Sequence, residues 1–298
     1  MNQMPSFKFF APVLLGALLA VSCGTGKQSA GVKALSYTSS VTSEDRVSRA
    51  GVPDYTVVSR PEIDLKSLPR LKGSWYVLFD GTRTDGWRGY AKDHLPSRWS
   101  IEDGCLRLKD RKAGEAAGLE GGDILFEHRF RNFELELEWK IAKGGNSGIF
   151  YLAREVRSTR NGKPWDAPMF YSAPEYQVLD NANHPDARKG VDGNRKSASL
   201  YDMIPARPQN QNPYGEWNKV RIVVRNGKVT HFQNGVEVVS YELGTPEWAE
   251  MLKASKFNPG KNPLAYDLLL GCGVPGYIGL QDHGNDVWYR NIRIKILK

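Results

Sequence analysis

The residues from Trp217 to Tyr241 are WNKVRIVVRNGKVTHFQNGVEVVSY. Apolar and polar side chains alternate along this run, and an asparagine–glycine pair interrupts it at Asn226 and again at Asn234. Such a pair supplies two neighbouring residues that tolerate positive φ, which a two-residue hairpin turn requires. Two of these turns in succession predict three antiparallel strands joined as a meander.

Strand patterns extend from this meander in both directions along the chain. Upstream, the residues from Phe133 to Trp139 alternate between apolar and acidic side chains, which gives a strand one apolar and one acidic face. Many short strands between turn signals predict an all-β sandwich or barrel. The other strand candidates are 75–79, 99–101, 105–108, 147–152, 175–179, 276–280 and 287–296.

One helix is predicted within this β pattern. Thr245 can cap its first turn, Pro246 suits the position that follows, and the helical pattern continues to Lys253. Two long segments, 155–173 and 181–215, are predicted as loops rich in Pro, Gly, Asn and Arg. Loops of that length in a compact domain are usually functional.

The start of the chain predicts export. The apolar run from Phe9 to Val21 is about 13 residues, whereas a membrane-spanning helix needs roughly 20. The run fits a signal peptide over residues 1–22. The residues before Cys23 resemble a lipobox, which makes Cys23 the lipid-modified first residue of the mature chain. An ordinary cleaved signal with an incidental cysteine is the alternative.

The mature chain is predicted to consist of a tether and one β domain. Residues 23–60 are rich in Ser, Thr, Gly and Lys and contain few large apolar groups, which predicts a flexible tether. Residues 61–298 remain for a single domain. No acidic residue directly follows Cys23, and this favours a periplasm-facing anchor in the cell envelope over surface display. The lipid is the only predicted contact with the membrane.

The net charge of +8 does not predict nucleic-acid binding. Basic residues are interspersed with acids, as in a solvated surface of mixed charge, and an exported protein rarely meets nucleic acid. Cys105 and Cys272 could pair in an oxidising compartment, but two separate buried thiols are an equal alternative. Neither has the spacing of a metal ligand. The sequence requires no cofactor, although carbonyl-rich loops could hold calcium.

The most informative polar pattern is Glu175-Tyr-Gln-Val-Leu-Asp180. On a strand, Glu175 and Gln177 point to the same face. Asp180 falls on the opposite face unless a bulge near Asn181 shifts it. With such a bulge, Glu175, Gln177 and Asp180 would line one groove. A plain surface strand that carries two acids is the alternative.

Two resemblances to known protein families suggest a function for the strand from Glu175 to Asp180. Its spacing resembles the Glu-x-Asp-x-x-Glu strand of laminarinase-like β-glucanases, although Gln177 and Asp180 depart from that pattern. Ordered blocks along the chain also resemble the 3-keto-disaccharide hydrolase domain family; they lie at 75–81, 145–151, 175–184, 200–202, 215–218, 276–283 and 287–292. This resemblance implies a concanavalin A-like jelly-roll β-sandwich, here with one short helical insertion, and hydrolysis of glycosidic bonds in sugars oxidised at C3. It also implies a saccharide partner and a sugar 3-oxidoreductase in the same pathway.

Candidate site residues follow from these patterns. The predicted catalytic residues are Glu175, Asp180 and His283, since a histidine that titrates near neutral pH could pass a proton. A structural role is the alternative for His283. The predicted substrate-binding residues are amides, hydroxyls, basic groups that could polarise a ketone, and aromatic rings, with Trp165 as the best stacking candidate. They are Asn146, Ser147, Tyr151, Arg154, Trp165, Gln177, Asn181, His184, Lys196, Gln281 and Asp282.

Two catalytic routes and one non-catalytic function remain open at this point. Glu175 and Asp180 could act as a carboxylate pair on the glycosidic bond. Alternatively, a base could remove the C2 proton that the C3 ketone acidifies, and the C1 substituent would leave before water adds. The second route explains a requirement for an oxidised sugar, and we prefer it. A non-catalytic carbohydrate-binding module on the same fold is the alternative from another class.

Overall fold

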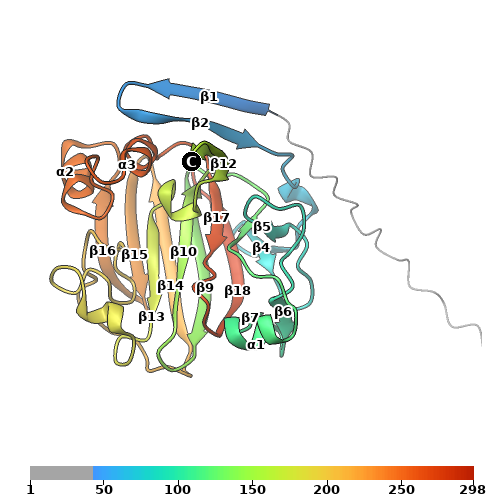
Figure 1. Cartoon of the computed structure of the whole chain (residues 1–298). Coiled ribbons are helices and arrows are strands. Elements are labelled where there is room, and N and C mark those ends of the chain that lie inside the picture. The colour runs from blue at the N-terminus through green and yellow to red at the C-terminus, as the bar shows by residue number, and fades with distance from the viewer. Residues whose placement is uncertain (1–42) are drawn as a thin grey trace, which may run out of the picture. The chain divides into compact units, whose positions relative to one another are not determined.

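The computed structural model describes residues 43–298, which form a concanavalin A-like jelly-roll β-sandwich with a helical insertion, as predicted (Figure 1). Every strand pairing is antiparallel. The predicted signal peptide, Cys23 and residues 24–42 of the predicted tether lie outside the described residues. No helix within residues 43–298 is long and apolar enough to span a membrane.

The larger sheet has nine strands. Seven follow the order β16-β15-β14-β9-β18-β4-β3, while β7 pairs with β18 and β6 pairs with β7. Their bounds are β3 (Arg70–Leu71), β4 (Trp75–Phe79), β6 (Trp99–Glu102), β7 (Cys105–Leu108), β9 (Phe133–Ile141), β14 (Asn218–Arg225), β15 (Lys228–Gln233), β16 (Val236–Glu242) and β18 (Val287–Ile296).

Two further sheets complete the β structure. The five-stranded sheet has the order β13-β10-β17-β8-β5 and packs on the larger sheet (Figure 1). Its strands are β5 (Trp87–Gly89), β8 (Ile124–Phe126), β10 (Asn146–Ala153), β13 (Glu175–Leu179) and β17 (Tyr277–Leu280). The four-stranded sheet has the order β1-β2-β11-β12, with β1 (Ser43–Arg49), β2 (Val52–Ser59), β11 (Glu155–Arg160) and β12 (Lys163–Asp166).

The helices are short and lie between strands. The α-helices are α1 (Arg111–Ala116), α2 (Pro246–Ala254) and α3 (Pro263–Leu270), and the 3-10 turns are η1 (Leu65–Ser67), η2 (Met169–Tyr171) and η3 (Pro185–Arg188). The predicted helix is confirmed as α2, in which the Thr245 hydroxyl accepts a hydrogen bond from the amide of Trp248. Helices α1 and α3 were not predicted from the sequence.

The predicted meander is confirmed as β14, β15 and β16. Asn226 and Asn234 both have a φ of 50°, and the glycine after each has a φ of 85°. Two consecutive residues with positive φ give the right-handed twist that adjacent antiparallel strands need. The asparagine–glycine pairs therefore set the register of three strands.

The core lies between the two larger sheets. Leu135, Leu137 and Trp139 of β9 are at most 2% exposed, and the acidic residues between them face outward. Hydrogen bonds also cross the sandwich. The hydroxyl of Tyr151 on β10 lies 2.7 Å from Nε2 of His231 on β15. This contact fixes which side chains of β10 point into the core.

Strands β10 and β13 are buried on both faces, since every residue in them is buried. Their inner face meets the larger sheet. Part of the outer face is covered by η2 and by an apolar cluster, whose buried members are Leu125, Phe150, Ala153, Met169, Ala173 and Tyr277. The outer face of the five-stranded sheet is therefore largely withdrawn from water.

Three sequence expectations need correction or completion. The tether was predicted to extend to residue 60, but residues 43–59 form the β1–β2 hairpin, which pairs with β11. Residues 155–173 were predicted as a loop, but they contain the β11–β12 hairpin. Cys105 and Cys272 are both buried and unpaired, so the separate-thiol alternative is confirmed.

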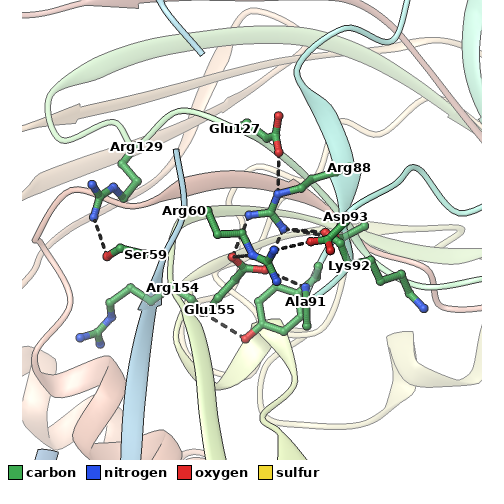
Figure 2. Close-up of polar contacts among 12 residues, drawn as sticks. Ser59, Arg60, Arg88, Ala91, Lys92, Asp93, Glu127, Arg129, Arg154 and Glu155 are labelled. Carbon is green, nitrogen blue, oxygen red and sulfur yellow. Dashed lines mark hydrogen bonds and ion pairs between the residues drawn. The ribbon is translucent and has the colours of Figure 1, made fainter. Parts of the chain in front are cut away.

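A buried ion network ties the four-stranded sheet to the sandwich (Figure 2). Glu155, at the start of β11, is 2% exposed. Its carboxylate accepts hydrogen bonds from Arg88 at 2.8 and 2.7 Å, from Arg60 at 3.2 Å, and from the amide of Ala91 at 2.7 Å. Arg88 also pairs with Glu127 at 2.8 Å. Removal of the Glu155 carboxylate would deprive two buried guanidinium groups, those of Arg60 and Arg88, of a negatively charged partner.

We predict that Glu155→Gln lowers the free energy of unfolding by about 3–5 kcal/mol, the range for one partner removed from a buried ion pair. Urea denaturation followed by circular dichroism measures this. Glu44→Gln is the control, because Glu44 pairs with Arg157 at the surface and should cost at most about 1 kcal/mol. An equal loss in the two variants would contradict the prediction.

Candidate active site

The floor of the candidate site is the outer face of β10 and β13. Ser147 and Tyr151 point into the core, so by strand alternation Asn146 and Gly148 point outward. Gly148 is in register with Gln177 on β13, and the amide of Gln281 donates to the Gly148 carbonyl at 3.0 Å. Asn146, Gln177 and Gln281 thus come together around Gly148.

Glu175 lies over Gly148. A Cβ atom placed on Gly148 would be 2.3 Å from Oε1 of Glu175, well below any normal contact. The glycine therefore leaves room for the carboxylate to lie flat on the sheet. Glu175 and Gln177 pair with Phe150 and Gly148 of β10, so their side chains lie on the same face of the sheet, as predicted.

Glu175 is a buried acid without a partner. It is 6% exposed, and its carboxylate makes no hydrogen bond or ion pair with any residue of 43–298. Burial raises the pKa of Glu175 well above its usual range, and the charges of Asp123 and Asp186 add to the shift, whereas Lys256 opposes it. A carboxyl group with a raised pKa can act as an acid or a base near neutral pH.

Lys256 places a cation near this carboxyl group. Its ammonium group lies 4.2 Å from the ring centre of Tyr201, 4.5 Å from Phe170 and 5.1 Å from Phe257. Burial lowers the pKa of Lys256, and the charge of Glu175 opposes that shift. Lys256 was not predicted as a site residue, because it lies between α2 and α3 and has no spacing relation to β13.

Two amide oxygens of the floor lack partners. Oδ1 of Asn146 and Oε1 of Gln281 are buried, and neither accepts a hydrogen bond from the part of the chain that the structure describes. A buried acceptor without a donor costs about 1–3 kcal/mol. Hydroxyl groups of a bound ligand would supply the missing donors. The binding roles of Asn146 and Gln281 stay predictions, and these two unsatisfied acceptors are the observation that supports them.

Asp123, which the sequence analysis missed, borders the floor at the start of β8. One of its oxygens accepts a hydrogen bond from the amide of Asp282 at 2.8 Å. Burial raises the pKa of Asp123 to about 7. A second acid that titrates near neutral pH therefore lies one strand beyond Gln281.

His184 and His283 lie together at the rim. Their ring centres are 6.1 Å apart, and Nδ1 of His184 accepts a hydrogen bond from the amide of Asp186 at 3.1 Å. Burial is the main cause that lowers the pKa of each histidine. Both are therefore mainly neutral at pH 7 and can accept a proton.

The other predicted catalytic residue, Asp180, is engaged elsewhere. Its carboxylate accepts four hydrogen bonds, from the amides of Gly144, Ala182 and Asn183 and from the side chain of Asn183. These bonds close the turn after β13. Asp180 thus stabilises the loop beside the floor, and the structure gives it no free oxygen directed at Glu175.

Several predicted binding residues make contacts within the loops that border the floor. Asn181 accepts a hydrogen bond from the amide of Ser197 at 2.8 Å and donates to Gln209 at 2.9 Å. Asp282 pairs with Arg98 at 2.9 Å. The side chain of Lys196 runs beside Gly193 in the loop between β13 and β14.

The remaining predicted residues lie away from the floor. Ser147 and Tyr151 face the core, where the sandwich occupies their hydroxyl groups. Arg154 donates to the carbonyl of Leu268 in α3. Trp165, on β12, packs against Tyr171 with ring centres 5.6 Å apart. The structure therefore does not bring these four side chains to Glu175.

No metal centre is evident in the described part of the chain, where no group of three or more His, Cys, Asp or Glu residues could hold an ion. The expectation that the protein needs no cofactor, with calcium as an option, stays a prediction.

Comparisons with known proteins place this chain in a family. A family model described as a 3-keto-alpha-glucoside-1,2-lyase-like domain matches residues 74–295. A curated protein of Bacteroides thetaiotaomicron named 3-keto-disaccharide hydrolase is 50% identical over 296 residues, which are 97% of this chain and 99% of that protein.

Solved structures are similar as well. One from Parabacteroides distasonis, described as a candidate glycosyl hydrolase, is 27% identical with a TM-score of 0.62, and the match covers 76% of this chain and 94% of that one. A second from the same organism is 24% identical with a TM-score of 0.51 and covers 75% and 99%. The second likeness concerns the fold alone.

We predict that Glu175→Gln stabilises the protein at alkaline pH. The pKa of Glu175 is raised in the folded state, so its favourable contribution is complete below the unfolded value of about 4.3 and is lost as pH rises through the folded value. The melting temperature of the variant minus that of the wild type should therefore increase from pH 4 to pH 9.

Glu242→Gln is the control, since Glu242 is an exposed residue of β16. Its difference from the wild type should stay constant with pH. If the melting temperature of Glu175→Gln minus that of the wild type decreased as pH rises, burial would not raise the pKa of Glu175.

Proposed function

Since this chain belongs to the 3-keto-alpha-glucoside-1,2-lyase-like family, we propose that it cleaves 3-keto-glycosides at the Glu175 site by elimination and hydration. The chain is an enzyme, a hydrolase of glycosidic bonds. The observation that carries the proposal is the buried, unpartnered carboxyl group of Glu175 with its raised pKa.

The first step is removal of the C2 proton. A ketone at C3 acidifies the neighbouring C–H bond, and the carboxylate of Glu175 takes the proton. A base is most effective when its pKa lies near the working pH, which burial of Glu175 favours. The electron pair of the C–H bond forms the enolate, and negative charge develops on the C3 oxygen.

Lys256 is the cation proposed to stabilise this oxygen. Preorganised charges aimed at developing charge are worth more in a site from which water is excluded. Aromatic rings surround the ammonium group of Lys256, and its charge acts on Glu175. Lys256 takes the role that the sequence analysis considered for Arg154 and Lys196.

The second step is loss of the group at C1 and addition of water. The enolate electrons expel the C1 oxygen, which needs a proton to leave as an alcohol. Asp123, whose pKa is about 7, is the proposed donor. Water then adds at C1 and gives its proton to the carboxylate of Asp123, while Glu175, whose proton exchanges with solvent, protonates C2. Both acids return to their starting state, and the net reaction is hydrolysis. This scheme accommodates both the lyase and the hydrolase in the names of the relatives.

The competing functions have less support. A carboxylate pair of Glu175 and Asp180 would need Asp180 free, but four hydrogen bonds occupy it. A non-catalytic binding module has no use for a buried acid with a raised pKa, and a relative of 50% identity is a named hydrolase.

The cellular setting is proposed from the sequence. Cys23 would carry the lipid anchor and hold the enzyme in the cell envelope, facing the periplasm. A substrate with a C3 ketone needs a preceding oxidation of the sugar, and a sugar 3-oxidoreductase is the class of enzyme that would supply it.

We predict that Glu175→Gln lowers kcat on a 3-keto-disaccharide by about 10²–10⁴-fold, because loss of a general base has that effect. KM should change only a few-fold, since the variant preserves the shape of the site. Asp180→Asn is the discriminating variant: with thermal stability monitored, a folded Asp180→Asn that loses as much activity as Glu175→Gln would favour the carboxylate pair.

The elimination route also predicts isotope incorporation. Turnover in deuterated water should place deuterium at C2 of the product, because C2 loses its proton and regains one from solvent. Mass spectrometry and NMR of the product, with Glu175→Gln as the control for spontaneous exchange, measure this. Product without deuterium at C2 would exclude the route.

A further inference from the structure

A hollow lies on the outer face of the five-stranded sheet, at the other end of β17 from the candidate active site. Tyr277 begins β17 and lines this hollow, whereas Gln281 follows the end of the strand. The hollow has a volume of about 480 Å³, and residues of the β1–β2 hairpin form part of its lining. Its apolar walls are Val57, Val58, Val274 and Pro275.

Arg154 supplies this hollow with a cation that lacks a counter-ion. Among the ion pairs of residues 43–298, none includes Arg154. Its Nη2 donates to the carbonyl of Leu268, and its Nε is buried without a partner. Figure 2 shows the side chain pointing away from Glu155 and its partners. Burial lowers the pKa of Arg154 and the charge of Asp267 opposes this shift without forming an ion pair, so a ligand anion in contact with the guanidinium group would favour its charged form.

The acids of the lining do not fill this role. Glu155 is held by Arg60 and Arg88, and Glu62 pairs with Arg129 at 2.6 Å. Asp45 lies on β1 and is exposed to solvent, where its charge is screened. Arg154 is therefore the lining cation whose charge is left for a ligand.

Tyr277 is a second group that awaits a partner. It is 2% exposed, and its hydroxyl has no hydrogen bond to any described residue. A buried hydroxyl without a partner costs free energy, so a ligand that reaches it gains affinity. Arg154 and Tyr277 together give the hollow one charged and one neutral anchoring point.

We propose that this hollow binds a small organic carboxylate, with the carboxylate on Arg154 and a polar substituent on the hydroxyl of Tyr277. A guanidinium group matches a carboxylate through two parallel hydrogen bonds. The valine and proline walls favour an organic acid over a bare inorganic anion. Because Val57 and Val58 belong to β2, the bound acid would also fasten the hairpin to the sandwich.

Calorimetric titration of the wild-type protein tests this site, with acetate, benzoate and gluconate as carboxylate probes. Inorganic phosphate and benzamide, the neutral analogue of benzoate, are the comparison ligands, and potassium chloride holds the ionic strength constant. Binding of at least one carboxylate, with benzamide silent and phosphate at least tenfold weaker, is expected. No binding of any carboxylate, or equal binding of benzamide or phosphate, overturns the proposal.

Two variants locate the binding. Arg154→Met should weaken the carboxylate at least tenfold, whereas Arg157→Met, which changes an exposed arginine of β11, should not. If Arg154→Met fails to fold, Tyr277→Phe tests the same site through its second anchoring residue. Because the hydroxyl has no partner in the protein, Tyr277→Phe should keep or raise the melting temperature and still weaken binding several-fold.

The result is independent of the Glu175 chemistry. Tyr277→Phe should leave turnover of a 3-keto-disaccharide unchanged. Carboxylate affinity that is unchanged in both Arg154→Met and Tyr277→Phe would place the bound acid elsewhere and overturn the assignment.

Discussion

Burial of the outer face of the five-stranded sheet is the constraint on which the rest of the site depends. A sandwich needs only one buried face per sheet, and the second face normally meets water. Here β10 and β13 are buried on both faces. A carboxyl group on that outer face is consequently removed from water, and its protonated form is favoured without any special ligand. The position of Glu175 on β13 thus determines its acidity.

The parts that the sequence predicted are those with local periodicity. Strand alternation gave the core face of β9, and the asparagine–glycine pairs gave the meander, because both depend on neighbouring residues only. The shared face of Glu175 and Gln177 has the same origin. The same alternation, counted from Asn146, places Ser147 and Tyr151 on the opposite face of β10. Both were predicted as binding residues from the chemistry of their side chains alone, and this put them on the wrong face.

The parts that the sequence did not predict depend on distant contacts. Lys256 reaches the site from a helical insertion about 80 residues after β13. The aromatic rings around its ammonium group, those of Phe170, Tyr201 and Phe257, come from three separate segments. Asp123 reaches it through a pairing between β8 and β17. The hairpin at residues 43–59 is polar enough to suggest a tether, and only its pairing with β11 makes it a strand pair.

Two buried glutamates show how one environment serves two purposes. Glu155 and Glu175 are 2% and 6% exposed, so both have lost their hydration. Glu155 is surrounded by two arginines and a backbone amide, and this satisfied network fastens β11 to the sandwich. Glu175 has no hydrogen-bond partner within residues 43–298, and the nearby cation of Lys256 is itself disfavoured by burial. The difference lies in the partners and not in the burial: a paired carboxylate stabilises a fold, and an unpaired one stays available for proton transfer.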